Sequence, residues 1–264
     1  MSAVIRQLGR ITLQFLSYLG QLMALIREIT QSIFFGRRRF ILTCRQMATI
    51  GFGSQLVIVI TGAFTGAVFA AQSFYMFNKV GLESGIGAVV SLAMSRELGP
   101  VLTGLMLAGR VGAAMAAEIG TMKVTEQIDA LRSMAVHPID YLVVPRLIGM
   151  VVSMPLLIAE SIAFGLIAAY LLSVKVFGIP DPWFLDHVRR HTELTDIALG
   201  MSKGIIFGLI IVIISCHQGL TVKNGAVGVG RGTTAAVVFS SLAILMSNFF
   251  LTVLINIFFP IKIA

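Results

Sequence analysis

The most constraining feature of the chain is an apolar run between residues 85 and 119 that carries only four formal charges, Arg96, Glu97, Arg110 and Glu118. About 20 apolar residues of helix cross a bilayer core, so this run is longer than one straight span requires. A charge at mid-bilayer costs at least about 2.5–3.5 kcal/mol on insertion scales, so the adjacent charges need compensation or a function. The run therefore predicts a long membrane helix with a polar step inside it.

Pro100 predicts a kink directly after this polar step. Proline has no N–H, so the carbonyl of Arg96, four residues earlier, loses its helical donor. Two interpretations of the stretch stay open: a tightly packed helix with a structural ion pair, or a polar patch on the route of a substrate.

Small residues recur at every fourth position after the kink, and glycines are also frequent in the preceding apolar run. Such positions allow a second helix to approach closely, which predicts tight helix packing in both runs. The positions are Gly104, Ala108, Gly112, Ala116 and Gly120 in the later run, and Gly51, Gly53, Gly62 and Gly66 in the earlier one.

Composition extends the membrane interpretation to the whole chain. Of its 264 residues, 57% are hydrophobic and 12% are charged, which is typical of an integral membrane protein. The apolar runs are long, which favours helices over the alternating strands of a barrel. We predict an all-α integral membrane protein with a transmembrane domain over residues 47–264 and five spans. These spans cover about 47–77, 85–118, 143–174, 197–217 and 235–259.

Residues 1–46 are predicted to form an amphipathic helix lying in the membrane interface, followed by a basic turn. Apolar side chains recur every three or four positions, and the opposite face is too polar to cross a bilayer. The apolar positions are Ile5, Leu8, Ile11, Phe15, Leu19, Leu22, Ile26, Ile29 and Ile33. The turn Gly36-Arg37-Arg38-Arg39 is predicted to be a cytoplasmic anchor. The alternative is a loosely attached helix without a role.

The distribution of basic residues predicts a cytoplasmic N-terminus. Segments on the N-terminal side of the membrane carry twelve Lys or Arg, against six on the other side. The first set covers 1–47, 119–146 and 218–232, and the second covers 78–84, 175–203 and 260–264. Basic residues accumulate on the cytoplasmic side of membrane proteins, which also explains the net charge of +8 better than a nucleic-acid partner would.

A polar segment at about 121–140 separates the second and third spans. Lys123 or Thr125 opens a predicted short helix, and His137-Pro138 closes it. A short exposed helix between two spans can contact a peripheral protein, but the composition also suits an ordinary solvated connection.

Glu160 is a lone acid near the middle of the third span. It is predicted to pair with Arg110 or Arg96, or to line a cavity. A proton-coupled secondary transporter would use Glu97 and Glu160 as proton carriers. That class usually contains internal repeats, and this sequence has none that we detect.

The glycine-rich stretch Gly225–Thr233 lacks the features of a phosphate-binding loop. Arg231 stands at the lysine position, Gly232 follows it in place of Ser or Thr, and no strand precedes it. We predict a flexible tight loop there, no bound nucleotide and no enzymatic activity in this chain. Two cysteines and four scattered histidines predict neither a disulfide framework nor a metal site.

Four motifs resemble the MlaE family, the permease subunits of MCE-associated lipid ABC transporters. They are Arg96-Glu97-Leu98-Gly99-Pro100-Val101, Ala108-Gly109-Arg110-Val111-Gly112, the run from Ala117-Glu118 to Ala130-Leu131, and the run from His137-Pro138 to Val144-Pro145-Arg146. The resemblance covers nearly the whole chain.

The resemblance implies a homodimer of multi-pass permeases in the bacterial inner membrane. It implies a cytoplasmic P-loop ATPase that uses ATP and Mg, often joined by a small STAS-domain protein. It further implies a periplasmic ring of MCE-domain subunits that passes phospholipid between this membrane and the outer one. The permease itself would bind no cofactor.

The resemblance also implies a lipid cavity between the two permease copies. Arg96 and Glu97 match positions that face this cavity, and Arg96 would attract the phosphate headgroup. At the outer end of the first span the matching positions are Phe69, Gln72 and Phe77. ATP binding by the partner would bring the two copies together at their small-residue faces.

Residues Glu126, Asp129 and Leu131 resemble the coupling helix that docks on the ATPase. The remaining intramembrane charges, Arg110, Glu118 and Glu160, receive no role from the resemblance.

Overall fold

The computed structural model describes residues 2–36, 39–79, 81 and 85–258, and every regular element in these ranges is helical. Five helices are long and apolar enough to cross a membrane. They span Phe40–Asn78, Ile86–Val124, Ile139–Val176, Leu194–Leu220 and Gly225–Phe258. The predicted class, an all-α integral membrane protein with five spans, is confirmed.

Several of the long helices contain π-helical turns. In chain order the elements are α1 (Ser2–Phe35), α2 (Phe40–Asn78), α3 (Ile86–Ala93), a π turn (Met94–Leu98), α4 (Gly99–Leu107), a π turn (Ala108–Gly112), α5 (Ala113–Val124), α6 (Gln127–Ser133), a π turn (Ile139–Val143), α7 (Val144–Leu171), a π turn (Leu172–Val176), α8 (Asp181–His191), α9 (Leu194–Leu220) and α10 (Gly225–Phe258). The second span is thus one continuous helix built from α3, α4 and α5.

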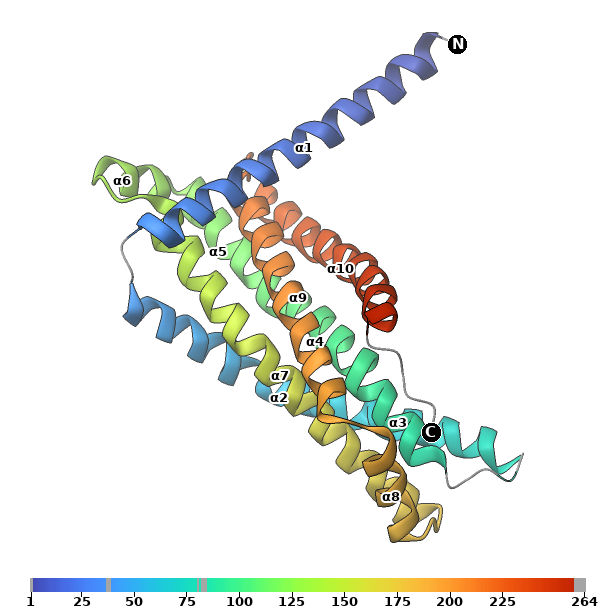
Figure 1. The fold of residues 1–264 in the computed structure, drawn as a ribbon. Coiled ribbons are helices and arrows are strands. Elements are labelled where there is room, and N and C mark those ends of the chain that lie inside the picture. The colour runs from blue at the N-terminus through green and yellow to red at the C-terminus, as the bar shows by residue number, and fades with distance from the viewer. Residues whose placement is uncertain (1, 37–38, 80, 82–84, 259–264) are drawn as a thin grey trace.

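The bundle consists of α2, the second span, α7 and α9, with α10 along one side (Figure 1). Its core contains side chains from all four, including Ile58, Leu107, Met150 and Phe207. In the most apolar window of α10 only 11% of residues are buried, against 61% for the span Ile139–Val176. The fifth span is therefore a peripheral helix, and α7 is the central one.

Glycines bring α2 and α7 into backbone contact. A Cβ atom on Gly66 would overlap the carbonyl of Gly165, and one on Gly62 would lie 2.7 Å from the carbonyl oxygen of Ser161. The close packing predicted from the glycines of the first span is therefore observed at these two positions.

The small-residue ladder of the second span faces α9 and α10 of the same chain. A Cβ atom on Gly112 would lie 2.9 Å from Ser215 Oγ, and one on Gly120 would lie 3.1 Å from Val222 Cγ2. The prediction that this face closes against a second copy is wrong, because packing within the chain already covers it.

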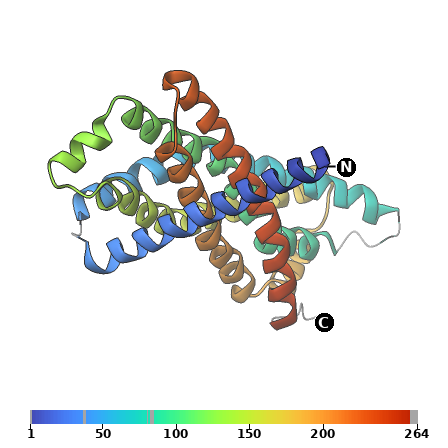
Figure 2. The same cartoon turned by 90° about the horizontal axis from the view of Figure 1, so that it is seen from above.

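Helix α1 lies across one end of the bundle, at the same end as α6, whereas α8 lies at the opposite end (Figure 1). Seen from above, α1 crosses over the bundle (Figure 2), and in the side view its N-terminal part projects away from the other helices (Figure 1). Leu25 and Ile29 are buried in the main core, and the Ser32 hydroxyl donates a hydrogen bond to Asp140. The C-terminal half of α1 is therefore attached to the bundle, unlike a loosely held helix.

Some predicted features lie outside the described residues. Arg37 and Arg38 of the basic turn are among them, as are the side chains of Ile5, Leu8, Ile11 and Phe15. Helix α2 begins at Phe40, before the predicted domain boundary at 47.

The glycine-rich segment 225–234 is helical, so the predicted flexible loop is wrong over these residues. The chain reverses earlier, at Asn224 and Gly225, which both have positive φ. The segment then continues directly into the apolar part of α10. Gly232 packs against Val222 of the turn, where a Cβ atom would lie 3.1 Å from Val222 Cγ2. Packing and the long apolar helix that follows override the low helix propensity of glycine.

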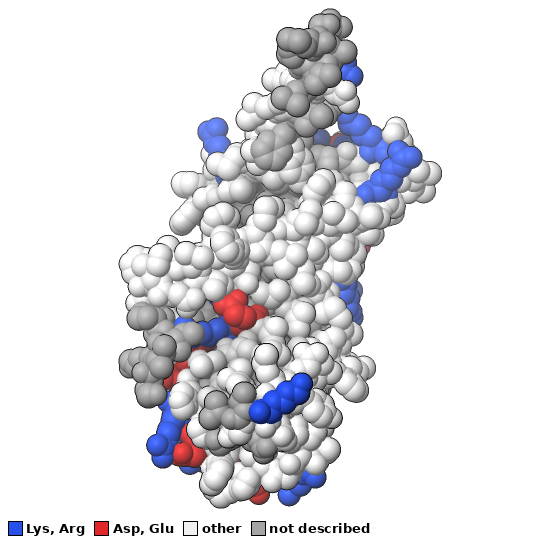
Figure 3. Space-filling model, turned by 90° about the vertical axis from the view of Figure 1, so that its right-hand side faces the viewer, with Lys and Arg blue, Asp and Glu red and all other residues white. Residues whose placement is uncertain are grey.

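Uncharged side chains cover most of the face drawn in Figure 3, and charged ones lie toward its two ends and in one group a little below the middle of the view. One basic residue that the charge count assigned to the outer segments, Lys203, lies instead inside α9 with 2% exposure. The difference in the number of Lys and Arg between the two sides of the membrane is therefore larger than the sequence count indicated.

Candidate functional site

The polar step lies in the π-helical turn Met94–Leu98. The N–H of Gly99 bonds to the carbonyl of Met94, five residues back, and Pro100 follows at the start of α4. The predicted irregularity is present, but it is a widened turn that begins before the proline. At this turn α9 approaches closely, because a Cβ atom on Gly200 would overlap the Ser95 carbonyl.

Lys203 satisfies the backbone carbonyl that Pro100 leaves without a helical donor. Its Nζ atom donates to the Arg96 carbonyl at 2.8 Å and lies 2.8 Å from Glu97 Oε1. It also donates to Thr252 Oγ1 at 3.0 Å and to Asn248 Oδ1 at 3.2 Å. One buried ammonium group thus joins the π turn to α10.

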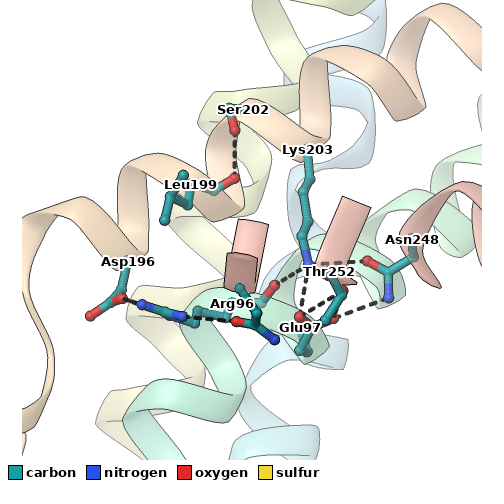
Figure 4. Close-up of polar contacts among 9 residues, drawn as sticks. Arg96, Glu97, Asp196, Leu199, Ser202, Lys203, Asn248 and Thr252 are labelled. Carbon is teal, nitrogen blue, oxygen red and sulfur yellow. Dashed lines mark hydrogen bonds and ion pairs between the residues drawn. The ribbon is translucent and has the colours of Figure 1, made fainter. Parts of the chain in front are cut away.

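Glu97 is bound from the other side by α10. Asn248 Nδ2 donates to Oε2 at 3.0 Å, and Thr252 Oγ1 donates to Oε1 at 2.9 Å (Figure 4). The Glu97 side chain is 37% exposed, whereas that of Lys203 is 2% exposed. The acid therefore forms the accessible edge of a pair whose cation is buried.

Arg96 turns toward the start of α9. Its Nε and Nη2 atoms lie 2.6 Å and 2.5 Å from Asp196 Oδ1, and its Nη1 donates to Asn256 Oδ1 at 3.3 Å. The other carboxylate oxygen of Asp196 accepts the backbone N–H of Glu193 at 2.8 Å and so caps α9. Figure 4 shows the Arg96–Asp196 pair beside the Glu97–Lys203 pair.

The four ionisable side chains form a cluster of two cations and two anions with no net formal charge. Arg96 and Glu97 each form an ion pair with a residue of α9: Arg96 with Asp196, and Glu97 with Lys203. Arg96 therefore has less free charge for a headgroup phosphate than the sequence suggested. The sequence analysis did not identify the polar partners of Arg96 and Glu97, because these partners lie about a hundred or more residues farther along the chain. They are Asp196, Lys203, Asn248, Thr252 and Asn256.

A hollow of about 330 Å³ lies on the surface of α2. Of the predicted cavity residues, Phe69 and Gln72 line it, together with Leu98, which directly follows Glu97. Its other lining residues are Phe64, Thr65 and Val68. Phe77 is absent from this lining and packs in a separate apolar cluster with Ala70, Ile86 and Phe184.

The other intramembrane charges have partners different from the predicted ones. Arg110 donates to Ser54 Oγ at 2.6 Å, and Glu160 accepts from Gln55 Nε2 at 2.9 Å. The prediction that Glu160 pairs with Arg110 or Arg96 is therefore wrong, because α2 lies against α7 and supplies the partner.

Glu118 forms an ion pair with Arg146, with 2.6 Å between Oε2 and Nη2. Arg146 is buried and also donates to the Leu142 carbonyl at 2.8 Å. This pair joins α5 to α7 near the α1 end of the bundle.

The predicted docking segment contains a helix of seven residues, α6. Glu126 precedes it with φ of 62° and is exposed. Asp129 is also exposed and lies 3.2 Å from Lys123 Nζ and 3.3 Å from Arg132 Nη1. Leu131 packs against the main core. Two of the three predicted docking residues are therefore accessible to a partner, and the third holds the helix on the bundle.

Residues 43–254 match the family model described as Permease MlaE. A protein of Rickettsia felis named as a probable ABC transporter permease is 42% identical over 249 residues, which are 94% of this chain and 96% of the relative. One of Synechocystis with the same description is 47% identical over 80% of each chain. The Arabidopsis thaliana protein named TRIGALACTOSYLDIACYLGLYCEROL 1, chloroplastic, is 42% identical over 80% of this chain and 60% of its own.

Proposed function

The chain belongs to the MlaE permease family, and from this premise we propose that it is the membrane subunit of an ABC transporter that moves phospholipid. The multi-pass architecture and the names of its relatives support a transporter permease. In our proposal it works in the bacterial inner membrane and exchanges lipid with a periplasmic MCE-protein carrier. The name of the Arabidopsis relative, which contains that of a glycolipid, supports a lipid substrate.

The observation that carries this proposal is the hollow on α2, whose lining includes Leu98 of the π turn. Phe64, Val68 and Phe69 give it an apolar wall suited to acyl chains. Leu98 follows Glu97 in the π turn, and the Glu97 carboxylate is partly exposed. Ligand sites are mostly apolar with a few placed polar groups, and a phospholipid has the same division.

A second copy of the chain would cover the hollow. Large apolar side chains of α2 near it are more than half exposed, among them Leu56, Phe64 and Val68. In the proposed homodimer these side chains would enclose a lipid between the two copies. A cytoplasmic ATPase, with Mg and ATP, and in some assemblies a STAS-domain protein, would complete the transporter.

The second span provides a mechanical connection between the ATPase and the hollow. It is one helix from Ile86 to Val124, with the polar step near one end and the docking segment directly after the other. Displacement at α6 would therefore move the π turn and strain the contacts that hold α10. The ATPase supplies the energy, and this chain converts it into a change of shape around the lipid.

The proton-coupled alternative assigns proton exchange to Glu97 and Glu160. Glu97 lies within 2.8 Å of a buried ammonium, and Glu160 bonds to an amide on α2. Family membership favours the ATP-driven mechanism.

Gentle affinity purification from native membranes tests the proposal. We expect a P-loop ATPase to co-purify and the eluate to hydrolyse ATP. If the chain repeatedly elutes alone and inactive in mild detergent, the ABC assignment fails and the proton-coupled mechanism becomes the leading one.

Substituting Glu126 with arginine is expected to reduce ATPase co-purification about tenfold, because the change reverses a charge at the exposed entry to α6. The yield of membrane-inserted protein should not change. Asp186→Arg is the matched control, since Asp186 is an exposed acid on α8 at the opposite end. Equal recovery of ATPase with both variants would remove Glu126 from the docking surface.

In the proposed site Arg96 contacts the headgroup phosphate in addition to Asp196. Substituting Arg96 with glutamine is therefore expected to reduce co-purified phospholipid about tenfold, since a hydrogen bond to a charged group contributes roughly 1.5 kcal/mol or more. Lipid phosphorus per mole of monodisperse protein is the measurement. Arg190→Gln, which changes an exposed arginine on α8, is the control. An unchanged lipid content in folded Arg96→Gln would show that this side chain is structural only.

A further inference from the structure

A groove of about 1210 Å³ lies between α1 and the adjoining ends of the bundle, far from the hollow on α2. Its walls come from α1, the end of α5, α6 and the turn after α9. The lining residues that matter here are Leu25, Glu28, Lys123, Ile128, Arg132 and Lys223.

The groove has an apolar floor and a basic rim. Leu25, Ile128 and Ile139 form part of the floor and are buried. Lys123 and Arg132 on the rim share one carboxylate, Asp129. Glu28 is the one acid in the lining. The lining itself therefore has three Lys or Arg against one acid, and two further acids, Asp129 and Asp140, pair with lining residues.

Lys223 is the rim cation with the most freedom to bind a ligand. It is exposed and forms no ion pair with any residue that the structure describes. A second hollow of about 260 Å³ on its other side is lined by Arg231. Basic groups thus continue from the groove to the start of α10.

The groove lies beside the helix that is predicted to lie in the membrane interface. Helix α1 forms one wall, and several of its apolar side chains are exposed: Leu13, Leu16, Leu19 and Met23. An amphipathic helix of this kind lies in the interface with its apolar face in the headgroup and acyl boundary. A groove beside it is therefore within reach of a lipid headgroup.

We propose that this groove binds an anionic phospholipid from the leaflet on the α1 side, separately from the transported lipid. Basic pockets between membrane helices on the cytoplasmic side are known to bind anionic headgroups. Lys223 and Arg132 contact the phosphate, and the acyl chains follow the apolar side of α1. Because Arg132 and Ile128 belong to α6, the bound lipid also holds the docking segment in place.

The full-length chain offers a direct test, because it contains a single tryptophan, Trp183, at the opposite end. The reporter protein carries Trp183→Phe together with Val136→Trp, which places a fluorophore in the groove lining. It is reconstituted in vesicles of brominated phosphatidylglycerol mixed with unbrominated phosphatidylcholine, and in the reverse mixture. Quenching of the tryptophan gives the relative affinity for the two lipids.

We expect about a fivefold preference for phosphatidylglycerol in the parent reporter, and less than about twofold after Arg132→Gln with Lys223→Gln. The matched control is Arg189→Gln with Arg190→Gln, which removes two exposed charges at the far end and should keep the full preference. Equal quenching by both lipids in the parent, or an unchanged preference in the groove variant, overturns the proposal.

A second readout separates a lipid from a protein occupant. The groove variant is purified in zwitterionic lipid only, and recovery of the ATPase is measured. If recovery falls although the parent shows no lipid preference, the groove binds an acidic protein segment and the lipid proposal is wrong.

Discussion

Replacing Lys203 with methionine is expected to destabilise the folded chain by about 3–5 kcal/mol, because removing one partner of a buried ion pair leaves the other charge uncompensated. Four groups lose their shared donor together: the Glu97 carboxylate, the Arg96 carbonyl, the Thr252 hydroxyl and the Asn248 amide oxygen. The thermal midpoint of the detergent-solubilised protein should fall by about 10 °C.

A double variant identifies the cause of this loss. Glu97→Gln added to Lys203→Met removes the unpaired carboxylate, so we expect it to recover a substantial part of the midpoint. Arg190→Met, which breaks an exposed pair with Asp186 on α8, should change the midpoint little. A double variant that is less stable than Lys203→Met would show that the packing of the lysine stem, and not charge compensation, carries its effect.

Replacing Gly66 with valine is expected to prevent normal accumulation of folded protein. The new side chain would meet the backbone of Gly165, which cannot move aside as a flexible side chain can. Overpacking in a well-packed interior typically costs about 1–3 kcal/mol, and contact with backbone lies at or above the top of that range. The amount of monodisperse protein extracted from membranes is the measurement.

Gly230→Val in α10 is the matched control for Gly66→Val. Both positions are helical, so the two variants share the same propensity cost, but a Cβ atom on Gly230 meets no atom within 4 Å. We expect near-normal accumulation of the control. Equal accumulation of both variants would mean that α2 and α7 separate easily, which contradicts the backbone contact described here.

The sequence predicted the spans because their signal is local. A long apolar run is sufficient to identify a membrane helix, and the cost of a buried charge identified Arg96 and Glu97 as unusual. The partners of those charges have no comparable signal. Asp196 and Lys203 lie near the beginning of the apolar run of α9, where polar residues are expected. Only the packing of α9 on the π turn buries their side chains in the protein.

Predictions that depended on the direction of a side chain were less accurate. Phe69 and Gln72 are three residues apart and lie on one face of α2, where both line the hollow. Phe77 is five residues beyond Gln72, which turns it about 140° around the helix and into another cluster. Glycine was ambiguous for a related reason, since the same residue type suits a loop and a close helix contact.

The residues of the charge cluster are synthesised at different times. The ribosome completes Arg96 and Glu97 about a hundred residues before Asp196 and Lys203, and Asn248 and Thr252 follow later still. Until α9 enters the bilayer, the second span must be held there with two charges that lack their final partners. The nascent chain therefore depends on a sheltered environment, such as the insertion machinery, until its fourth helix has been made.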